Sequence, residues 1–285
     1  MSAQLLEGGP IAEQIKAEIR AEIEKMARPP QLVAVMVGDN AGARMYAKMQ
    51  DKSCAEVGIA YELKEFDEGI SEADLLGEIE SLNEDESVDG LILQMPVPEH
   101  INARTVQATI APQKDVDGVN PTNLGRVVMG HSEAAPCTAQ AAVRLVEETG
   151  IDLYGAEVVV VGHSEIVGKP VALLLLDEFA TTSVCHIGTS DAGMLKEHTK
   201  GADILIVAVG VAGLIKGDMI KPGAAVIDVG INRVKDPETG KSKTVGDVAF
   251  DEAVEVAGII TPVPGGVGPI TTAMLLHSTL LAAKS

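Results

Sequence analysis

The spacing of hydrophobic residues changes between a helical and an alternating period several times in the first half of the chain. From Ile11 to Ile23 an isoleucine recurs at every fourth position with charged residues between, so residues 11–27 are predicted to form an amphipathic helix. The apolar run 31–37 predicts a strand, and residues 43–57 predict a helix that ends at Gly58.

This alternation of strand and helix continues to residue 94. Residues 59–66 alternate like a strand, Ser71 and Asp74 have the spacing of a helix start, and residues 90–94 form another apolar strand. The order αβαβαβ predicts a parallel α/β sheet, and ligands of such sheets bind at the carboxyl ends of the strands.

The second half of the chain repeats the strand and helix alternation. Strands are predicted at 158–161, 183–187, 204–209 and 224–231, with helices from about 168 and near 191–199. This βαβαβ order predicts a second, doubly wound domain. We expect residues 1–139 with 270–285, which include a helix at 270–283, to form one domain, and residues 140–269 to form the other.

The stretch 157–170, EVVVVGHSEIVGKP, joins a buried strand, a glycine turn and a helix start without interruption. Gly162 ends the strand, and Ser164, Gly168 and Pro170 suit a turn whose backbone N–H groups face an anion at a helix N-terminus. The spacing differs from G-x-G-x-x-G, so the motif alone leaves two alternatives: a dinucleotide loop, or a βα turn without a ligand.

The amino-acid composition argues against several classes of function. Aromatic residues make up only 2% of the 285 residues, and a formal net charge of −20 opposes binding to nucleic acid or to an anionic membrane. No basic segment followed by an apolar one opens the sequence, which favours a cytoplasmic protein. Three widely spaced cysteines suggest neither a disulfide framework nor a metal site; each is expected to be a small buried residue, and they are Cys54, Cys137 and Cys185.

Several loops combine glycine, proline and polar residues where a ligand could bind. Gly210 and residues 230–232 follow predicted strands of the second domain, where a nicotinamide cofactor could lie. Residues 261–269, TPVPGGVGP, have prolines that fix φ and glycines that allow positive φ, so they predict a rigid irregular loop that lets the backbone approach a ligand.

With these motifs in this order, the chain resembles the methylenetetrahydrofolate dehydrogenase/cyclohydrolase family over nearly its whole length. The segments that carry the resemblance are QMPVP at 94–98, KDVDG at 114–118, PCT at 136–138, 162–170 and 261–269. The resemblance implies an α/β catalytic domain and a Rossmann-like dinucleotide-binding domain with folate in the cleft between them, in a homodimer. It also implies oxidation of 5,10-methylenetetrahydrofolate with NADP or NAD, followed by hydrolysis of the methenyl product to 10-formyltetrahydrofolate.

The resemblance also assigns roles to residues of the first domain. Tyr46 is similar to the tyrosine that stacks on folate, Asp117 to the aspartate that holds the pterin, and Gln94 to an active-site glutamine. Each has a structural alternative: a helix-surface residue for Tyr46 and a strand-end amide for Gln94. In the loop 114–118, which also contains Asp117, Asp115 is alternatively a structural carboxylate that binds no ligand.

Further positions fall on the cofactor and on the loop that borders the substrate. The resemblance implies that Gly162, His163, Ser164 and Ile231 contact the cofactor, and that Gly265, Gly266 and Pro269 border the substrate. Relatives with Arg at 163 and Ser at 187 hold the 2′-phosphate of NADP, whereas this chain has His163 and Ile187. NADP is the first choice, with NAD as the alternative.

One catalytic position departs from the family pattern. The family places a lysine four residues after the tyrosine, and this chain has Gln50 there. That lysine is implied to serve the cyclohydrolase step, and an amide has no usable pKa for it. Lys48 and Lys52 each lie about 200° around the helix from Gln50 and do not replace it.

Three hypotheses follow. The first is a folate dehydrogenase with reduced or absent cyclohydrolase activity, because hydride departure leaves an iminium cation directly and needs no base. The second is a catalytically silent relative that binds folate or a partner subunit. The third is an α/β dehydrogenase acting on a non-folate substrate.

Overall fold

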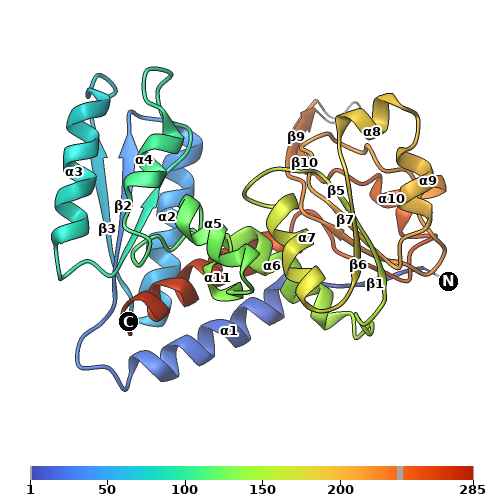
Figure 1. The fold of residues 1–285 in the computed structure, drawn as a ribbon, viewed down its shortest axis with the longest axis horizontal. Helices are drawn as coiled ribbons and strands as arrows, with labels where there is room; N and C mark the ends of the chain where they lie inside the picture. Colours follow the sequence, from blue (N-terminus) through green and yellow to red (C-terminus); the bar gives the residue numbers. More distant parts are fainter. Residues whose placement is uncertain (1, 236–239, 285) are drawn as a thin grey trace. The chain divides into compact units, whose positions relative to one another are not determined.

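The computed structural model describes residues 2–235 and 240–284, and its chain divides into two compact units (Figure 1). Unit 1 comprises Met1–Ile11 and Thr138–Thr271, and unit 2 comprises Ala12–Cys137 and Thr272–Ser285. Each unit has a parallel sheet with helices packed on it, which confirms the two-domain α/β fold.

Unit 2 contains a three-stranded parallel sheet in the order β3-β2-β4. The observed chain order agrees with the predicted one; its elements are α1 (Gly8–Ile23), β2 (Gln31–Val37), α2 (Ala41–Val57), β3 (Ala60–Phe66), α3 (Glu72–Glu84) and β4 (Gly90–Leu93). Two predicted helix boundaries are confirmed. Gly58 ends α2 in the left-handed conformation. Ser71 begins α3, and its hydroxyl accepts a hydrogen bond from the Asp74 backbone N–H. The sequence analysis missed the short helices after β4, α4 (Ala103–Thr109) and α5 (Pro121–Val128).

The core of unit 2 follows the alternation along β2. Val33, Val35 and Val37 pack in one cluster with apolar residues of α3 and α4, and their neighbours in β2 point to the opposite face of the sheet. All residues from Leu32 to Val37 are buried because both faces are covered. The sheet is therefore a fixed platform for the loops at the carboxyl ends of its strands.

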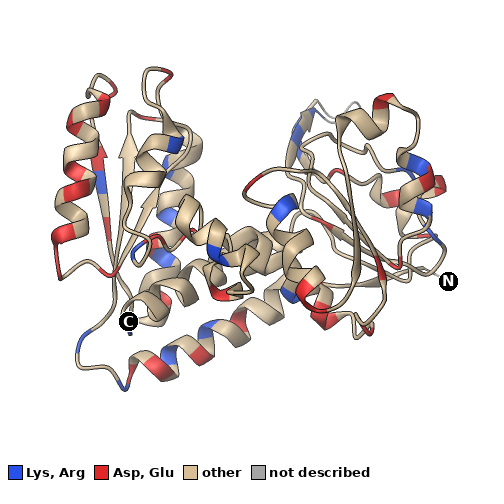
Figure 2. Cartoon of the chain, in the orientation of Figure 1, with Lys and Arg blue, Asp and Glu red and all other residues tan. Residues whose placement is uncertain are grey.

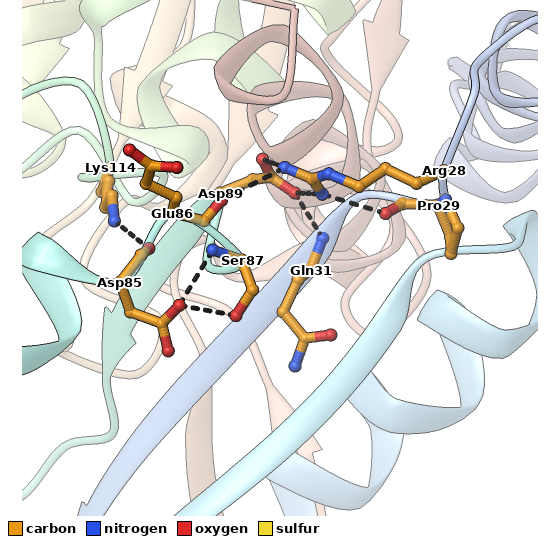
Figure 3. A network of polar contacts seen from close by, with 8 residues as sticks. All are labelled: Arg28, Pro29, Gln31, Asp85, Glu86, Ser87, Asp89 and Lys114. Carbon is orange, nitrogen blue, oxygen red and sulfur yellow. Dashed lines mark hydrogen bonds and ion pairs between the residues drawn. The ribbon is translucent and has the colours of Figure 1, made fainter.

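A polar network holds the amino ends of β2 and β4 (Figure 3). The buried Asp89 carboxylate accepts a bond of 2.7 Å from each terminal nitrogen of Arg28 and one of 2.7 Å from the Gln31 backbone N–H. Nearby, the Lys114 ammonium donates to the Asp85 carbonyl oxygen at 2.6 Å. The network lies at the end of the sheet opposite to the carboxyl ends, so it stabilises the fold without touching the site described below.

Unit 1 is built on a six-stranded parallel sheet in the order β1-β11-β8-β7-β5-β6. Its strands are β1 (Gln4–Leu5), β5 (Glu157–Val161), β6 (Thr181–Cys185), β7 (Ile204–Val207), β8 (Ala225–Asp228) and β11 (Ile259–Ile260). The first residues of the chain lie in this unit because β1 pairs with β11, whereas the sequence analysis grouped them with the folate domain. Its other two boundaries, after residues 137 and 271, lie within two residues of the expected ones.

The remaining elements of unit 1 differ in places from the predicted ones. The strand expected at 183–187 is β6, which ends at Cys185, and Ile187 begins a short helix. The helix expected near 191–199 is two helices, because Gly193 has a φ of 72° and interrupts it. The elements are α6 (Cys137–Glu148), α7 (Gly168–Asp177), α8 (Ile187–Asp191), α9 (Leu195–Lys200), α10 (Phe250–Ala253) and the antiparallel pair β9 (Asn232–Lys235) and β10 (Ser242–Val245).

The last helix, α11 (Val267–Ala282), begins earlier than expected. Pro269 lies in its first turn, where a missing N–H costs little, so the irregular loop ends at Gly266. Of the described helices, none is long and apolar enough to cross a membrane. The three cysteines are buried and unpaired, as expected. Figure 2 shows acidic residues at several positions along α1 and α3.

Candidate functional site

Helix α2 places Tyr46 and Gln50 one turn apart. The helix begins at Asn40, whose side-chain oxygen accepts bonds from the backbone N–H groups of Gly42 at 2.9 Å and Ala43 at 3.0 Å. Residues four apart lie on the same side of a helix, and Gln50 belongs to the buried side. Tyr46 is half-buried at the edge of that side.

Gln50 is completely buried and shares its amide with two other side chains. Its Oε1 atom accepts a bond of 2.7 Å from Gln94 Nε2 and one of 3.2 Å from the Tyr61 hydroxyl. Its Nε2 atom has no hydrogen-bond partner with regular geometry in the described parts of the chain. A buried amide N–H₂ without a protein partner is a donor available to a bound molecule.

Neither of the two lysines near Gln50 on α2 supplies the positive charge that Gln50 lacks. The Lys52 side chain is 82% exposed, with its ammonium 3.9 Å from the Glu56 carboxylate, and Lys48 is exposed as well. The helical geometry expected from the sequence is therefore observed, and the amide remains neutral at this position.

Asp115 and Asp117 lie two residues apart but differ in their hydrogen bonds and in the effect of burial. The buried Asp115 accepts bonds from the backbone N–H groups of Gly118 and Asn120, at 3.1 and 2.7 Å, and from Asn123 Nδ2 at 2.9 Å. Asp117 forms no ion pair with any described residue, and burial, aided by the charge of Asp115, raises its pKa to about 7. Asp115 thus shapes the loop, and Asp117 keeps its oxygens for other contacts.

Tyr46 and Asp117 lie close enough to influence each other. Burial raises the pKa of the Tyr46 phenol to about 12, and Asp117 adds to the rise, whereas the nearby Gln50 and Thr272 oppose it. Burial also holds the pKa of the Cys137 thiol well above its usual value, so this thiol is not a nucleophile. The structure therefore brings Tyr46, Gln50 and Gln94 together as neutral donors and acceptors, with the carboxyl group of Asp117 close to Tyr46.

In unit 1, the turn after β5 is too tight for side chains at its two glycines. Gly162 has a φ of 128°, and a Cβ atom there would lie 2.2 Å from the Ala208 carbonyl oxygen. A Cβ on Gly168, the first residue of α7, would lie 2.1 Å from the Gly162 oxygen. The Ser164 hydroxyl accepts a bond of 3.2 Å from the Val167 N–H and orders the turn between them. The close approach of strand and helix matches what a dinucleotide-binding turn requires.

His163 and Ile231 are exposed at the carboxyl edge of the same sheet. The His163 ring lies edge-on to His186, with ring centroids 5.3 Å apart. Ile231, after β8, is 69% exposed, as is Ile187 at 73%. No carboxylate ends β6, where NAD-binding domains hold the ribose 2′-hydroxyl, so Cys185-His186-Ile187 fits a cofactor with a 2′-phosphate.

The loop 261–266 is held by the first turn of α1. The Gly8 N–H donates to the Gly265 carbonyl oxygen at 2.9 Å, and a Cβ on Gly8 would lie 1.9 Å from the Gly266 oxygen. Gly265, with a φ of 110°, is exposed, whereas Gly266 is buried and Pro269 half-buried. The predicted rigid, irregular backbone is therefore present from Thr261 to Gly266.

Two residues escaped the sequence analysis. Asp228 and Asp247 are buried side by side below the loops that follow β7 and β8. In the sequence, Asp228 is visible only as an acidic residue at the end of the apolar run AVID, and Asp247 only as an acidic residue after a glycine in GDV. Neither pattern distinguishes a buried carboxylate from a solvated one, so the sequence analysis places Asp228 in the predicted strand 224–231 and Asp247 in a loop, without a role for either.

Unit 1 has a glycine turn that suits a dinucleotide. Unit 2 has a cluster of amides and a carboxylate without a nucleophile. Together these two features are typical of nicotinamide-dependent dehydrogenases. The family follows from sequence profiles. The tetrahydrofolate dehydrogenase/cyclohydrolase catalytic domain matches residues 6–117, and the NAD(P)-binding domain of the same family matches residues 136–285. The chain belongs to the tetrahydrofolate dehydrogenase/cyclohydrolase family.

Individual relatives cover the whole chain. The bifunctional protein FolD 2 of Mesorhizobium japonicum is 49% identical over 98% of this chain and 91% of its own. The bifunctional protein FolD of Bacillus thuringiensis is 47% identical over 100% and 98%.

Solved structures give the same result. A bifunctional FolD enzyme from Campylobacter jejuni matches with a TM-score of 0.93 and 41% identity, over 99% of both chains. The Trypanosoma brucei methylenetetrahydrofolate dehydrogenase-cyclohydrolase, complexed with NADP and an inhibitor, matches with a TM-score of 0.92 and 36% identity, over 100% of this chain and 98% of its own.

Proposed function

We propose that this protein oxidises 5,10-methylenetetrahydrofolate to the methenyl cation with NADP as hydride acceptor, in one-carbon metabolism. The observation that supports this most directly is the cluster in unit 2, where Gln94 and Gln50 are joined at 2.7 Å beside Tyr46 and Asp117. These types of side chain suit a flat pterin with an amino and amide edge, and none of them is a nucleophile for covalent catalysis.

Each residue of unit 2 then has a distinct task. Tyr46 stacks on the folate ring system, and Asp117 accepts paired N–H bonds from the pterin edge. Gln94 and Gln50 orient the reacting part of the substrate through their amides, and the unpartnered Gln50 Nε2 donates to it. A bound nicotinamide would supply the hydride acceptor, and no base is needed because the carbon that loses the hydride becomes a cation.

The nucleotide is assigned to unit 1. Gly162, His163, Ser164 and Ile231 hold it, and Gly265, Gly266 and Pro269 border the folate. NADP is favoured over NAD because β6 ends without an acidic residue and because His163 and His186 supply two imidazoles nearby. NAD remains the alternative acceptor.

The second reaction of the family, hydrolysis of the methenyl cation, is proposed to be reduced or absent. Hydrolysis requires a proton to leave the attacking water, and an amide has no pKa in the range that would accept it. Gln50 is fully buried, and both neighbouring lysines of α2 are exposed to solvent. The dehydrogenase step then ends with release of the methenyl product.

A spectrophotometric assay of the wild-type protein tests both steps. With methylenetetrahydrofolate and NADP, we expect reduced nicotinamide and methenyl absorbance to accumulate together. The Gln50→Lys variant is expected to hydrolyse the methenyl product, while Lys52→Gln, which removes an exposed charge from the same helix, is the matched control. Absence of turnover at micromolar enzyme would reject the dehydrogenase, and equal hydrolysis by wild type and Gln50→Lys would reject the role given to position 50.

The oligomeric state and the cellular location are also proposed. We propose a homodimer in the cytoplasm that binds neither nucleic acid nor membranes, supported by the net charge of −20 and by the family resemblance. Light scattering after size-exclusion chromatography measures the dimer, and a mass of one chain at micromolar concentration would contradict it.

A further inference from the structure

Two buried carboxylates meet at the carboxyl ends of β7 and β8. Asp228 is the last residue of β8 and is 4% exposed, and Asp247 is completely buried. Neither forms an ion pair with any lysine, arginine or histidine that the structure describes. Their negative charges are instead balanced by hydrogen bonds, mainly from backbone N–H groups, a costly arrangement that needs a reason beyond packing.

Asp247 connects the loops that follow the two strands. Its Oδ2 atom accepts bonds from the backbone N–H groups of Val209 at 2.7 Å and Gly210 at 2.9 Å. Its Oδ1 atom accepts a bond of 2.8 Å from Asn232 Nδ2. One carboxylate therefore fixes the loop after β7 relative to the loop after β8.

Asp228 supports this arrangement from below. Its Oδ1 atom accepts bonds of 3.0 Å from the N–H groups of Gly230 and Asp247, and its Oδ2 atom accepts one of 2.9 Å from Val248. Its own N–H donates to the Thr261 hydroxyl at 2.8 Å. Burial raises the pKa of this carboxyl to about 6, which measures the cost of keeping it charged.

Two glycines let the backbone close over these carboxylates. A Cβ atom on Gly230 would lie 2.1 Å from Asp247 Cγ, and one on Gly246 would lie 1.9 Å from Asp228 Oδ2. Above this rigid base, the loops expose apolar side chains, with Val211 at 51% and Ile231 at 69%. Exposed apolar residues on an immobilised backbone are typical of a surface that receives a ligand.

We propose that Asp247, supported by Asp228, is a positioning residue that fixes the backbone at 209–210 and 230–232 as the surface for the nicotinamide end of the cofactor. The proposal rests on the proposed function. The glycine turn after β5 lies between β6 and β7 in the sheet order, so a dinucleotide bound across that turn has its adenosine half toward β6 and its other half toward β7 and β8.

The test compares two ligands that differ in the nicotinamide half. NADPH carries this half, and its nicotinamide fluorescence reports binding, whereas adenosine 2′,5′-bisphosphate lacks it and is measured by calorimetry. In Asp247→Asn, the negative charge is lost and a single side-chain oxygen is left to accept from Val209, Gly210 and Asn232, so we expect NADPH to bind on the order of tenfold to a hundredfold more weakly. The bisphosphate is expected to bind within about twofold of wild type, as no contact with its half changes.

A compensated variant separates positioning from folding. In Asp247→Asn with Asn232→Asp, the amide of residue 247 donates to the new carboxylate and its oxygen accepts from Val209 and Gly210, so NADPH binding is expected to recover to within a few-fold of wild type. Asn232→Ala removes one bond to Asp247 and is expected to weaken NADPH alone. The matched control is Asp203→Asn, because the Asp203 carboxylate also holds a backbone N–H, that of Glu157, but at the amino ends of the strands.

The outcomes separate the two proposals. Wild-type protein that binds neither NADPH nor the bisphosphate would reject the proposed function. Wild-type binding of NADPH with unchanged binding by Asp247→Asn or Asn232→Ala would reject the inference alone. Equal loss of both ligands in Asp247→Asn, or failure of the double variant to restore NADPH binding, would reduce Asp247 to a structural residue.

Discussion

Asp117 is expected to destabilise the protein that it serves, and Asp117→Asn measures by how much. A pKa of about 7 in place of 3.8 means that the ionised group costs roughly 4 kcal/mol in the folded state, at about 1.4 kcal/mol per pH unit. The folded state holds the proton more tightly than the unfolded chain. Stability is therefore full below pH 3.8, falls as the pH rises toward 7, and then stays level.

The variant should lack this pH dependence because an amide is neutral throughout. At pH 8 we expect Asp117→Asn without ligand to be more stable than wild type by up to about 4 kcal/mol, with the difference shrinking to nothing near pH 4. Urea unfolding followed by circular dichroism measures it, because the chain has no tryptophan for fluorescence. The same variant should lose folate affinity, since an amide cannot accept two bonds from the pterin edge.

Asp115→Asn is the matched control, because it makes the same chemical change two residues away. Asp115 accepts three hydrogen bonds at 2.7 to 3.1 Å, so an amide N–H₂ there would face donors and destabilise the protein at pH 8. Opposite signs for the two variants would support the division of roles between the two aspartates. A stability of Asp117→Asn at pH 8 equal to or below that of wild type would refute the reasoning.

Three further predictions use other parts of the structure. Arg28→Ala removes the cation beside the buried Asp89. Because the Arg28 side chain is 50% exposed to solvent, we expect a loss of only about 1 to 2 kcal/mol in urea unfolding. The KM for the folate substrate should be unchanged, and a changed KM would contradict the distance of Arg28 from the site. His163→Arg should tighten NADP binding about tenfold relative to NAD at pH 8, measured by calorimetry, because guanidinium stays charged; equal effects on both cofactors would count against a 2′-phosphate contact. Gly162→Ala places a Cβ 2.2 Å from the Ala208 oxygen at a φ of 128°, so NADPH binding should be lost; normal binding would refute the glycine requirement.

The strands β2 and β4 and the long helices of unit 2 were predictable because each buries a continuous apolar face, whereas the short helices α4 and α5 were not predicted. The run 32–37 is apolar and buried throughout, and Gly58 ends α2 where a glycine was expected. Strands of two residues are too short to show a hydrophobic pattern in the sequence. β1 and β11 have two residues each, and their pairing joins segments that are far apart in the sequence, so no local pattern could indicate them.

The candidate site was predictable to the extent that the family motifs name its residues. The contact between Gln50 and Gln94 joins positions 44 residues apart, and it places an amide oxygen where the family pattern has a lysine. The buried pair Asp228 and Asp247 could not be predicted, because the sequence shows two acidic residues without showing that backbone N–H groups surround them. Such pairs depend on loop geometry, which hydrophobic patterns do not encode.

The pairing of β1 with β11 also sets the order in which the protein can fold during synthesis. Gln4 and Leu5 are synthesised 255 residues before their partners Ile259 and Ile260, the difference between the paired residue numbers. The sheet of unit 1 therefore cannot be completed on a nascent chain until β11 has been translated, whereas the sheet of β2, β3 and β4 can form early. A substitution in β1 would thus act on the six-stranded sheet of unit 1, although the residues from Ala12 onward belong to unit 2.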